Sequence, residues 1–239
     1  MADARLPHAS FDCLLRVETL DAGSAQVQAH GQAWCTEAES ERARGFGAEH
    51  RRRQYLAGHW LARRLAAERF GGQAAQWQWQ TTATGAPSLQ HPALADAVSV
   101  SVSHSGDAIA AAVASRPIGL DLEFPRRPRP LRELAAFAFS PEENAALGVL
   151  PEAAYGEHFY ALWSLKEAQG KRSGRGLLPG LARRITSRRC GLAEAEALLW
   201  PLPAQGSLAL AAWPGCRIDV QGLAGDAQAT PWRYVDATG

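Results

Sequence analysis

Two acidic residues in the sequence IGLDLEF have a spacing that suits metal chemistry. Asp121 and Glu123 stand two residues apart, so on a strand both carboxylates project from the same face, about 7 Å apart at the backbone. Two neighbouring anions repel unless a cation or a proton lies between them. Mg²⁺ meets this need, because it binds one or two carboxylates together with phosphate oxygens and water. The alternative is an edge strand whose polar face is solvated. Judged from these two residues alone, this alternative is favoured over a metal site.

A third carboxylate and two lysines occur in the sequence FYALWSLKEAQGK. If this segment is a helix, residues four apart share one face, and they are Phe159, Trp163, Glu167 and Lys171. This stripe begins aromatic, which directs it towards the core, and ends ionic, with Lys166 beside Glu167. Its end is therefore an ordinary surface ion pair, worth roughly 0.3–0.5 kcal/mol, or one wall of a site for a charged ligand. In the second case Glu167 completes a metal site, and the lysines bind a polyphosphate on that metal.

Two further groups of residues are candidates for binding phosphate. Ser103 and His104 end a predicted strand at a turn, where backbone N–H groups and a hydroxyl can hold an anion. A lone histidine at a turn is more often an ordinary polar surface residue. Arginines are dense over residues 41–69, and three consecutive ones at 51–53 spread positive charge over several helix faces. That arrangement suits a ligand with several phosphates, and it also suits nucleic acid.

The strands that must carry these residues follow from periodicity. Valines alternate with serines over 98–103, and the apolar run AIAAAVA follows, which predicts a hairpin with its turn at residues 105–107. In the predicted strand 118–123, apolar residues take one face while Asp121 and Glu123 take the other.

The remaining elements predict an α+β fold. Residues 10–35 indicate one or two strands, and residues 37–70 a helix that opens with a capping box at Thr36 and Glu39 and stops at Gly71. The sequence FSPEE opens another helix, with serine as N-cap and proline as its first residue. The last 50 residues indicate strands. Strands and helices are thus mixed rather than regularly alternating.

The composition excludes several classes of protein. The chain has 239 residues, 46% hydrophobic, with 25 basic against 24 acidic residues, so it is not built as a whole for nucleic acid or for membranes. Its four cysteines lie far apart without a C-x-x-C motif, which predicts neither a zinc site nor a redox pair. The start, MADARLPHAS, does not resemble a signal peptide, and no apolar run could span a bilayer. We therefore expect a cytoplasmic protein.

Taken in order, the motifs GAP, SVSVSHSG, IGLDLE, FYALWSLKEAQGK and GRGL resemble those of the 4′-phosphopantetheinyl transferases, specifically the two-lobed surfactin-synthetase-activating (Sfp) type. The resemblance includes the S-H-x-G turn at 103–106, the G-[IVL]-D-[IVL]-E strand at 119–123 and the W-x-x-K-E-A-x-x-K helix ending at Lys171. It runs from about residue 40 to residue 180. It implies two similar α/β lobes in one pseudo-dimeric chain, 1–116 and 117–239, with the active site in the cleft between them.

The resemblance also implies a reaction. Such enzymes move the 4′-phosphopantetheine of coenzyme A onto a serine of an apo acyl carrier protein or a peptidyl carrier protein domain and release 3′,5′-ADP. These carriers serve fatty acid, polyketide and nonribosomal peptide biosynthesis. We expect a monomer that binds neither nucleic acid nor membranes.

By match of position, the resemblance assigns catalytic roles to five residues. Asp121, Glu123 and Glu167 hold Mg²⁺ on the pyrophosphate of coenzyme A, and Glu167 takes the proton of the carrier serine. The proton transfer to Glu167 is direct or runs through a metal-bound water. Lys166 and Lys171 lie near the pyrophosphate, and Lys171 is the one implied to neutralise the leaving diphosphate. Positioning and charge neutralisation of this kind are what phosphoryl transfer requires of a protein.

The resemblance places the 3′-phosphate of coenzyme A against a second set of residues. Ser103, His104 and Arg42 cradle it, with a contribution from Arg53. One position departs from the family: Ala86 stands where members often have a lysine that reaches a phosphate. We expect this alanine to reduce the affinity for coenzyme A unless an arginine elsewhere compensates, and the sequence does not identify that arginine.

Two other functions remain open at this point. The first is a Mg²⁺-dependent pyrophosphatase acting on coenzyme A or a nucleotide, which would use the same carboxylates with water as the nucleophile. The second is a nucleic-acid-binding module built on the arginines of 41–69, which predicts strongly salt-dependent binding to DNA. The second leaves the three carboxylates without a role.

Overall fold

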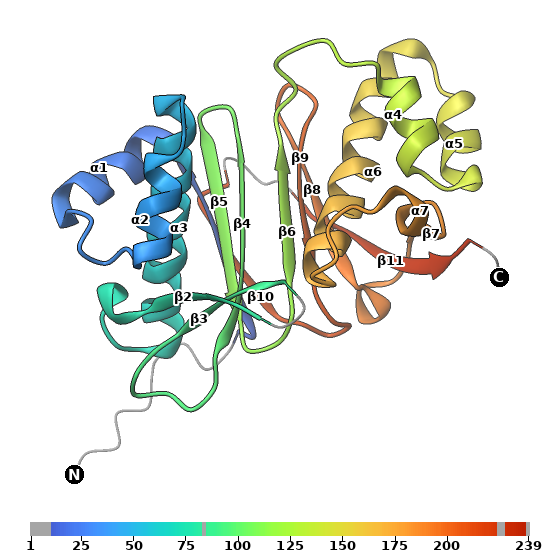
Figure 1. Cartoon of the computed structure of the whole chain (residues 1–239). Coiled ribbons are helices and arrows are strands. Elements are labelled where there is room, and N and C mark those ends of the chain that lie inside the picture. Colours follow the sequence, from blue (N-terminus) through green and yellow to red (C-terminus); the bar gives the residue numbers. More distant parts are fainter. Residues whose placement is uncertain (1–10, 83–84, 224–227, 238–239) are drawn as a thin grey trace. The chain divides into compact units, whose positions relative to one another are not determined.

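The computed structural model describes residues 11–82, 85–223 and 228–237, and these residues form two compact units. Of the described residues, the first unit takes 11–82, 87–117 and 216–223, and the second takes the rest. Each unit contains one sheet and one long helix packed on it (Figure 1). The mixed fold confirms the predicted α+β class. Among the described residues, no helix is long and apolar enough to cross a membrane.

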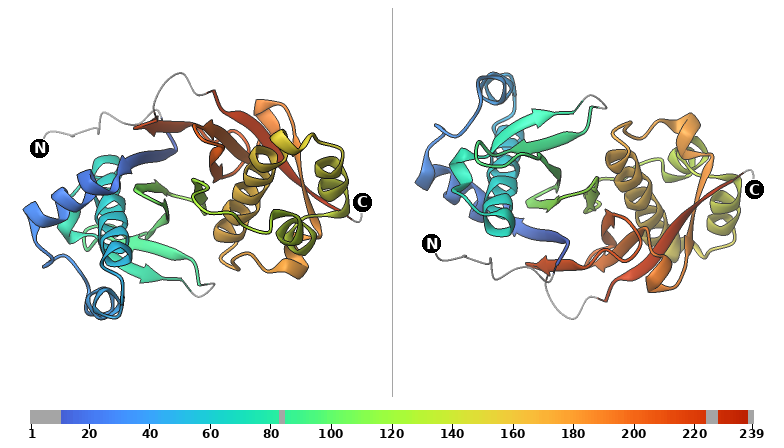
Figure 2. Two further views of the ribbon diagram at one scale, coloured as in Figure 1. Left: turned by 90° about the horizontal axis from the view of Figure 1, so that it is seen from above. Right: turned by 90° about the horizontal axis from the view of Figure 1, so that it is seen from below.

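The first unit is built on a sheet of strand order β10-β1-β5-β4-β3-β2, in which β1 and β10 are parallel and the other pairs antiparallel. Its strands are β1 (Cys13–Thr19), β2 (Gln78–Thr81), β3 (Pro87–Gln90), β4 (Val98–Ser105), β5 (Ala108–Ala114) and β10 (Ile218–Gln221). Its helices are α1 (Leu20–His30), α2 (Glu37–Arg44), α3 (Glu49–Phe70) and the short η1 (Ala74–Gln76). Helix α3 packs on β4 and β5, and the core lies between them (Figure 2).

The predicted hairpin is present as β4 and β5. Gly106 has a φ of 58° in its tight turn, a left-handed conformation that glycine adopts without strain. The start of α3 is fastened to this turn, because the side chains of His50 and Gln54 both contact the carbonyl oxygen of Gly106, at 3.1 and 2.7 Å. The turn that follows His104 is therefore held by α3.

The second unit is built on an antiparallel sheet of strand order β6-β9-β8-β11-β7. Its strands are β6 (Gly119–Glu123), β7 (Ile185–Arg189), β8 (Ala197–Leu202), β9 (Gly206–Ala211) and β11 (Thr230–Asp236). Its helices are α4 (Leu131–Ala138), α5 (Pro141–Gly148), α6 (Glu152–Arg172), α7 (Pro179–Ala182) and the short η2 (Leu192–Glu194). Helix α6 packs along β6 and β9.

The contact between β6 and α6 depends on a glycine. A Cβ atom added to Gly119 would lie 2.0 Å from the carbonyl oxygen of Ala168 and 2.4 Å from the backbone nitrogen of Arg172. The two backbones therefore meet where a side chain would stand, and only glycine permits this approach. Because Asp121 is two residues further along β6, its side chain is on the same face and also points towards α6.

Two expectations from the sequence are wrong. Residues 20–30 form α1 rather than a second strand, because Thr19 caps a helix there by accepting a hydrogen bond from the backbone of Ala22. The predicted helix over 37–70 is two helices, since α2 ends at Arg44, with Gly45 as its C-cap, and α3 begins at Glu49. The capping box of Thr36 and the stop at Gly71 are both confirmed.

We predict that Gly119→Ala lowers the free energy of unfolding by about 2 kcal/mol or more, because overpacking of a close contact typically costs 1–3 kcal/mol and here the obstacle is backbone. Denaturant-induced unfolding of the two proteins measures it. The control is Gly148→Ala at the end of α5, where the added methyl group meets nothing within 4 Å. Equal stability of the two variants would contradict the role assigned to Gly119.

Candidate active site

A buried carboxylate and a lysine form the centre of the site in the second unit. Asp121, on β6, is 5% exposed, and its Oδ1 accepts a hydrogen bond of 2.7 Å from the ammonium of Lys171 on α6. The same ammonium donates to the carbonyl oxygen of Leu120 at 2.9 Å. The predicted stripe along α6 thus brings Lys171 to the predicted strand face of Asp121.

The other two carboxylates share the same negative environment. Burial, and then the charge of Asp121, raise the pKa of Glu123 to about 7. Burial, and then Asp121, also raise the pKa of Glu167, while the positive charges of Lys171 and Arg129 act in the opposite direction. Asp121 is therefore close enough to both glutamates to oppose their ionisation, as expected for neighbouring acids.

Arg129 is a site residue that the motifs did not indicate. Its guanidinium lies 5.2 Å from the ring centroid of Trp163 on α6. Its positive charge partly offsets the rise in the pKa values of Glu123 and Glu167. Trp163 is one turn before Glu167, so the aromatic ring supports a cation beside the carboxylates. The proline-rich sequence PRRPRP contains the arginine, but sequence alone does not say which arginine folds back.

The structure does not bring Lys166 to this cluster. Its ammonium is buried in an ion pair of 2.8 Å with Glu143 of α5 and also donates to the carbonyl oxygens of Ala182 and Ile185. Adjacent helix residues point about 100° apart, so Lys166 cannot share the direction of Glu167. This position corrects the expectation that Lys166 lies near a pyrophosphate: the lysine instead ties α6 to α5 and to the segment before β7.

Within the described residues, no group of three or more His, Cys, Asp or Glu side chains is arranged as a ready-made metal site. The donor chemistry nevertheless fits Mg²⁺, because Asp121, Glu123 and Glu167 are oxygen donors whose mutual repulsion is already visible in their environment. At present Lys171 supplies the positive charge at Asp121. A divalent cation would relieve the same excess of negative charge.

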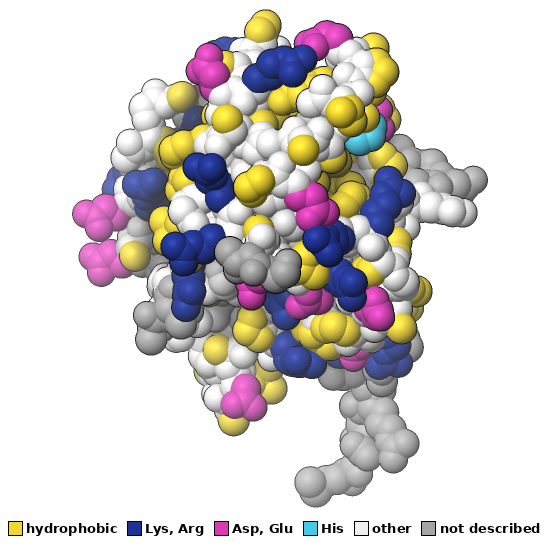
Figure 3. Space-filling model, turned by 90° about the vertical axis from the view of Figure 1, so that its right-hand side faces the viewer, with side chains coloured by type: hydrophobic (Ala, Val, Ile, Leu, Met, Phe, Trp, Pro, Cys, Tyr) yellow, Lys and Arg dark blue, Asp and Glu magenta, His cyan; other side chains and the backbone are white. Residues whose placement is uncertain are grey.

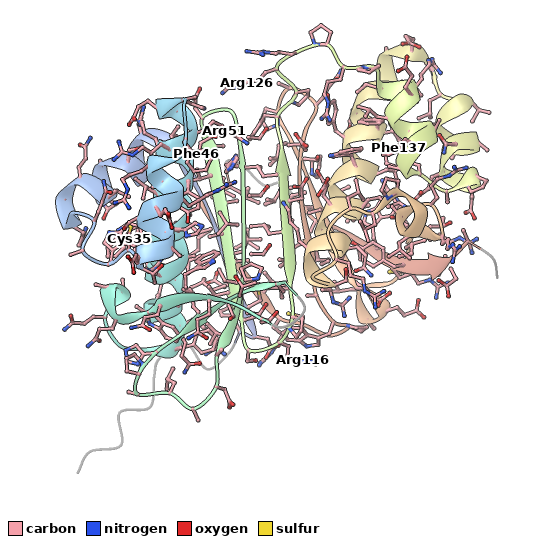
Figure 4. The ribbon with its side chains drawn as sticks, viewed as in Figure 1. Cys35, Phe46, Arg51, Arg116, Arg126 and Phe137 are labelled. Carbon is pink, nitrogen blue, oxygen red and sulfur yellow. The ribbon has the colours of Figure 1, made fainter. Side chains whose placement is uncertain are left out.

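In the first unit, the residue beside His104 is Arg51. Its guanidinium lies 3.4 Å from Nδ1 of His104, at the end of β4 (Figure 4). Because arginine has no acceptor, Nδ1 of His104 accepts this bond and the ring proton is on Nε2. Ser103 precedes it on β4 and is buried. A cation and an imidazole therefore lie together at the hairpin, an arrangement suited to an anion, whereas the side chain of Ser103 leaves the opposite face of β4.

The other predicted phosphate ligands lie elsewhere in this unit. Arg53 binds Asp21 and Ser24 of α1, at 2.6 and 3.1 Å, so the structure does not bring it to His104. Arg42 lies on α2, with its guanidinium 5.3 Å from the ring of Phe46. A helical wheel could have identified Arg51 as the arginine that faces His104. Residues seven apart share a helix face, and Gly58, seven residues after Arg51, packs against β4.

A buried ion network holds α2 against α3. Arg63 is fully buried and donates to both carboxylate oxygens of Glu39, at 2.9 and 2.7 Å, and His59 contacts the same carboxylate at 2.7 Å. Burial alone would raise the pKa of Glu39, but the hydrogen bonds from His59 and Arg63 outweigh it and lower the pKa to about 2. The ring of His59 stacks on Trp79. This network fixes the helix that carries Arg42.

Comparison with known proteins points to one family. A family model described as "4′-phosphopantetheinyl transferase superfamily" matches residues 117–201, the segment that contains Asp121, Glu123, Glu167 and Lys171. The phosphate-binding candidates of the first unit lie outside this match.

Individual relatives carry the same description. A protein named "4′-phosphopantetheinyl transferase" from Bacillus subtilis is 35% identical over 137 residues, which cover 57% of this chain and 59% of that protein. "4′-phosphopantetheinyl transferase HetI" from Nostoc sp. strain PCC 7120 is 30% identical over 159 residues, covering 66% of this chain and 67% of that protein. "4′-phosphopantetheinyl transferase Sfp" from Bacillus subtilis strain 168 is 31% identical over 138 residues, covering 57% and 59%. The match to the first relative thus spans about three fifths of its length.

We predict that Glu39 makes the protein sensitive to acid. Its folded pKa of about 2 is below the ordinary value of 4.5, so its stabilisation is complete above pH 4.5 and is lost as pH falls from 4.5 towards 2. The loss is on the order of 3 kcal/mol, from about 1.4 kcal/mol per pKa unit.

The measurement is the free energy of unfolding against pH for the wild type and for Glu39→Gln. The variant is less stable throughout, because Arg63 loses a charged partner, but its curve is flatter between pH 4.5 and 2.5. Parallel curves for the two proteins would show that Glu39 titrates normally.

Proposed function

The chain belongs to the 4′-phosphopantetheinyl transferase superfamily, and from that premise we propose that it transfers the 4′-phosphopantetheine of coenzyme A to a serine of an apo acyl or peptidyl carrier protein. The observation that carries the proposal is the cluster of Asp121, Glu123 and Glu167, with Lys171 and Arg129 around it. Three crowded carboxylates compensated by two cations suit a metal-bound pyrophosphate.

In the proposed reaction the serine oxygen of the carrier attacks the phosphorus that bears the pantetheine group. A new phosphorus–oxygen bond to the serine forms, the bond to the bridging oxygen breaks, and 3′,5′-ADP leaves. Glu167 accepts the serine proton. Its raised pKa supports this role, because a base is most effective when its pKa approaches the working pH.

Lys171 is proposed to balance the charge of the leaving diphosphate. Its side chain is 30% exposed, so its ammonium can exchange a protein partner for a phosphate oxygen. Mg²⁺ held by Asp121, Glu123 and Glu167 would supply electrostatic stabilisation of the pyrophosphate oxygens. Arg129, whose guanidinium lies over the ring of Trp163, contributes positive charge from the proline-rich segment that follows β6.

The phosphate at the nucleotide end of coenzyme A is proposed to bind Ser103, His104 and Arg42. The contact of Arg51 with His104 adds Arg51 to this set, and Arg53 has the weakest support because Asp21 and Ser24 hold it. With Ala86 in place of a lysine, we propose that Arg51 supplies the missing positive charge.

The protein is proposed to act as a monomer. The carrier is proposed to dock on the segment after β6. Arg126 lies on the loop that leaves β6, and Phe137 on α4 is 59% exposed (Figure 4). The arginines of the loop and, separately, the exposed ring on α4 suit an acidic helix with an apolar stripe, since charge attracts the partner and an aromatic ring can anchor it.

The test of transfer is intact-mass spectrometry of an apo acyl carrier protein incubated with this protein, coenzyme A and Mg²⁺. The wild type is expected to add one phosphopantetheine. Glu167→Gln keeps the size of the side chain but removes the base, so the rate should fall about 10²- to 10⁴-fold. EDTA should also stop the reaction.

The matched control is Glu157→Gln, the same change at an exposed position of the same helix, which should keep the wild-type rate. Cleavage of coenzyme A without a modified carrier would favour the pyrophosphatase instead. Intact coenzyme A with several acyl and peptidyl carriers would overturn the proposed activity.

A second prediction concerns docking. Arg126→Glu and Arg127→Glu, made singly, should raise the carrier KM about 5- to 10-fold and leave the KM for coenzyme A unchanged, because losing a charge complement weakens encounter with an acidic partner by about 1 kcal/mol. Arg233→Glu, on β11, makes the same charge change and should leave both constants unchanged. An unchanged carrier KM in both loop variants removes this surface from the proposal.

A further inference from the structure

The second unit contains a cavity that the proposed reaction does not use. Its volume is about 360 Å³, and it lies between helices α5 and α6 and the strands β7, β8, β9 and β11. None of Asp121, Glu123, Glu167 and Lys171 lines it. The volume is within the range of pockets that hold small molecules, and far above the roughly 30 Å³ of one water.

Most of the wall is apolar. The apolar side chains come from both helices and from the sheet: Ala146, Leu147, Leu150, Ala161, Leu162, Leu199, Pro201 and Trp232. Hydrophobic side chains also reach the surface on the face of the molecule drawn in Figure 3. A ligand of this cavity must therefore have a mainly apolar body.

One polar group in the wall lacks a partner. Ser187 is 5% exposed, and among the described residues no group forms a hydrogen bond with its Oγ. Strand register places this hydroxyl on the cavity side, because Ser187 pairs with Tyr234, whose own hydroxyl donates to Leu165 of α6. Paired residues of neighbouring antiparallel strands point to the same face. A buried hydroxyl is normally hydrogen-bonded, so a ligand group here would complete it.

The charges in the wall disfavour an anion. The wall contains the carboxylates of Glu142, Glu143 and Glu157 but only one cation, Arg189, whose guanidinium lies over the ring of Trp232. The first two carboxylates are paired with Arg188 and Lys166, at 2.6 and 2.8 Å, and Glu157 is balanced in number by Arg189, so the wall offers no excess positive charge to an anion. A carboxylate or phosphate ligand would lose its hydration here without gaining a counter-ion.

We propose that this cavity is a binding site for a small, uncharged, largely apolar molecule that hydrogen-bonds to Ser187 Oγ. The proposal rests on the cavity, the hydroxyl and the wall charges, and it is independent of the transferase reaction. Because all wall residues belong to the second unit, binding needs nothing from the first.

The experiment is a fluorescence titration of the full chain with N-phenyl-1-naphthylamine, an uncharged probe whose emission rises in apolar surroundings. Its secondary amine can donate to a serine oxygen. The comparison probe is 8-anilinonaphthalene-1-sulfonate, which has the same ring system and an added negative charge. The proposal expects saturable binding of the neutral probe, at least 10-fold tighter than the sulfonate. Equal or tighter binding of the sulfonate would overturn it.

A matched pair of variants locates the site. Ala145 and Ala146 are neighbouring exposed residues of α5, but only Ala146 belongs to the cavity wall. Ala146→Trp should close the cavity and abolish saturable binding, while Ala145→Trp should leave it intact. Circular dichroism and thermal unfolding check that both variants are folded. Loss in both, or retention in both, would mean that the probe binds elsewhere.

Ser187→Ala tests the anchor without blocking the cavity. Loss of one neutral hydrogen bond corresponds to about a 2- to 12-fold weaker affinity. The neutral probe should therefore bind to Ser187→Ala about 2- to 12-fold more weakly than to the wild type. Its affinity should be unaffected by Ser207→Ala, because the hydroxyl of Ser207 is already bonded to Ser164 and to the carbonyl oxygen of Tyr160. Unchanged affinity in Ser187→Ala would contradict the proposed anchor.

Discussion

The crowding of three carboxylates in a poorly solvated place is the constraint on which the second unit depends. Burial and the charge of Asp121 raise the pKa values of Glu123 and Glu167, so the fold must bring cations to this cluster. It brings Lys171 by packing the backbone of α6 directly against β6, which Gly119 permits. Any larger residue at that position would push α6 away from β6. It would therefore separate Asp121 on β6 from Lys171 on α6, the cation that compensates it.

The stripe along α6 explains how one helix serves both the core and the site. Its first member, Phe159, is fully buried and stacks on Trp163, whose ring supports the guanidinium of Arg129. The next turns carry Glu167 and Lys171. The helix therefore uses hydrophobic burial in its first half to hold charged groups in its second half, because packing of the aromatic end fixes the direction of the ionic end.

Local signals made part of this structure predictable. The hairpin, the start of α5 and the face shared by Asp121 and Glu123 follow from patterns within about ten residues. The errors have a different origin. Arg51 rather than Arg53 reaches His104, and Lys166 turns to Glu143, because helix α1 and helix α5 supply competing partners from distant parts of the chain. No short pattern contains those partners.

The two lysines of α6 differ in burial, and burial decides which of their ion pairs can exchange a partner. Lys166 is 1% exposed and has a carboxylate and two carbonyl oxygens around its ammonium, so a ligand would have to break a buried ion pair to reach it. Lys171 is 30% exposed, and its pair with Asp121 borders solvent. A pair whose ammonium borders solvent loses less when that partner is exchanged, because water and ligand can replace it stepwise. Of the two adjacent turns, only that of Lys171 can therefore change partners during a reaction while the fold stays intact.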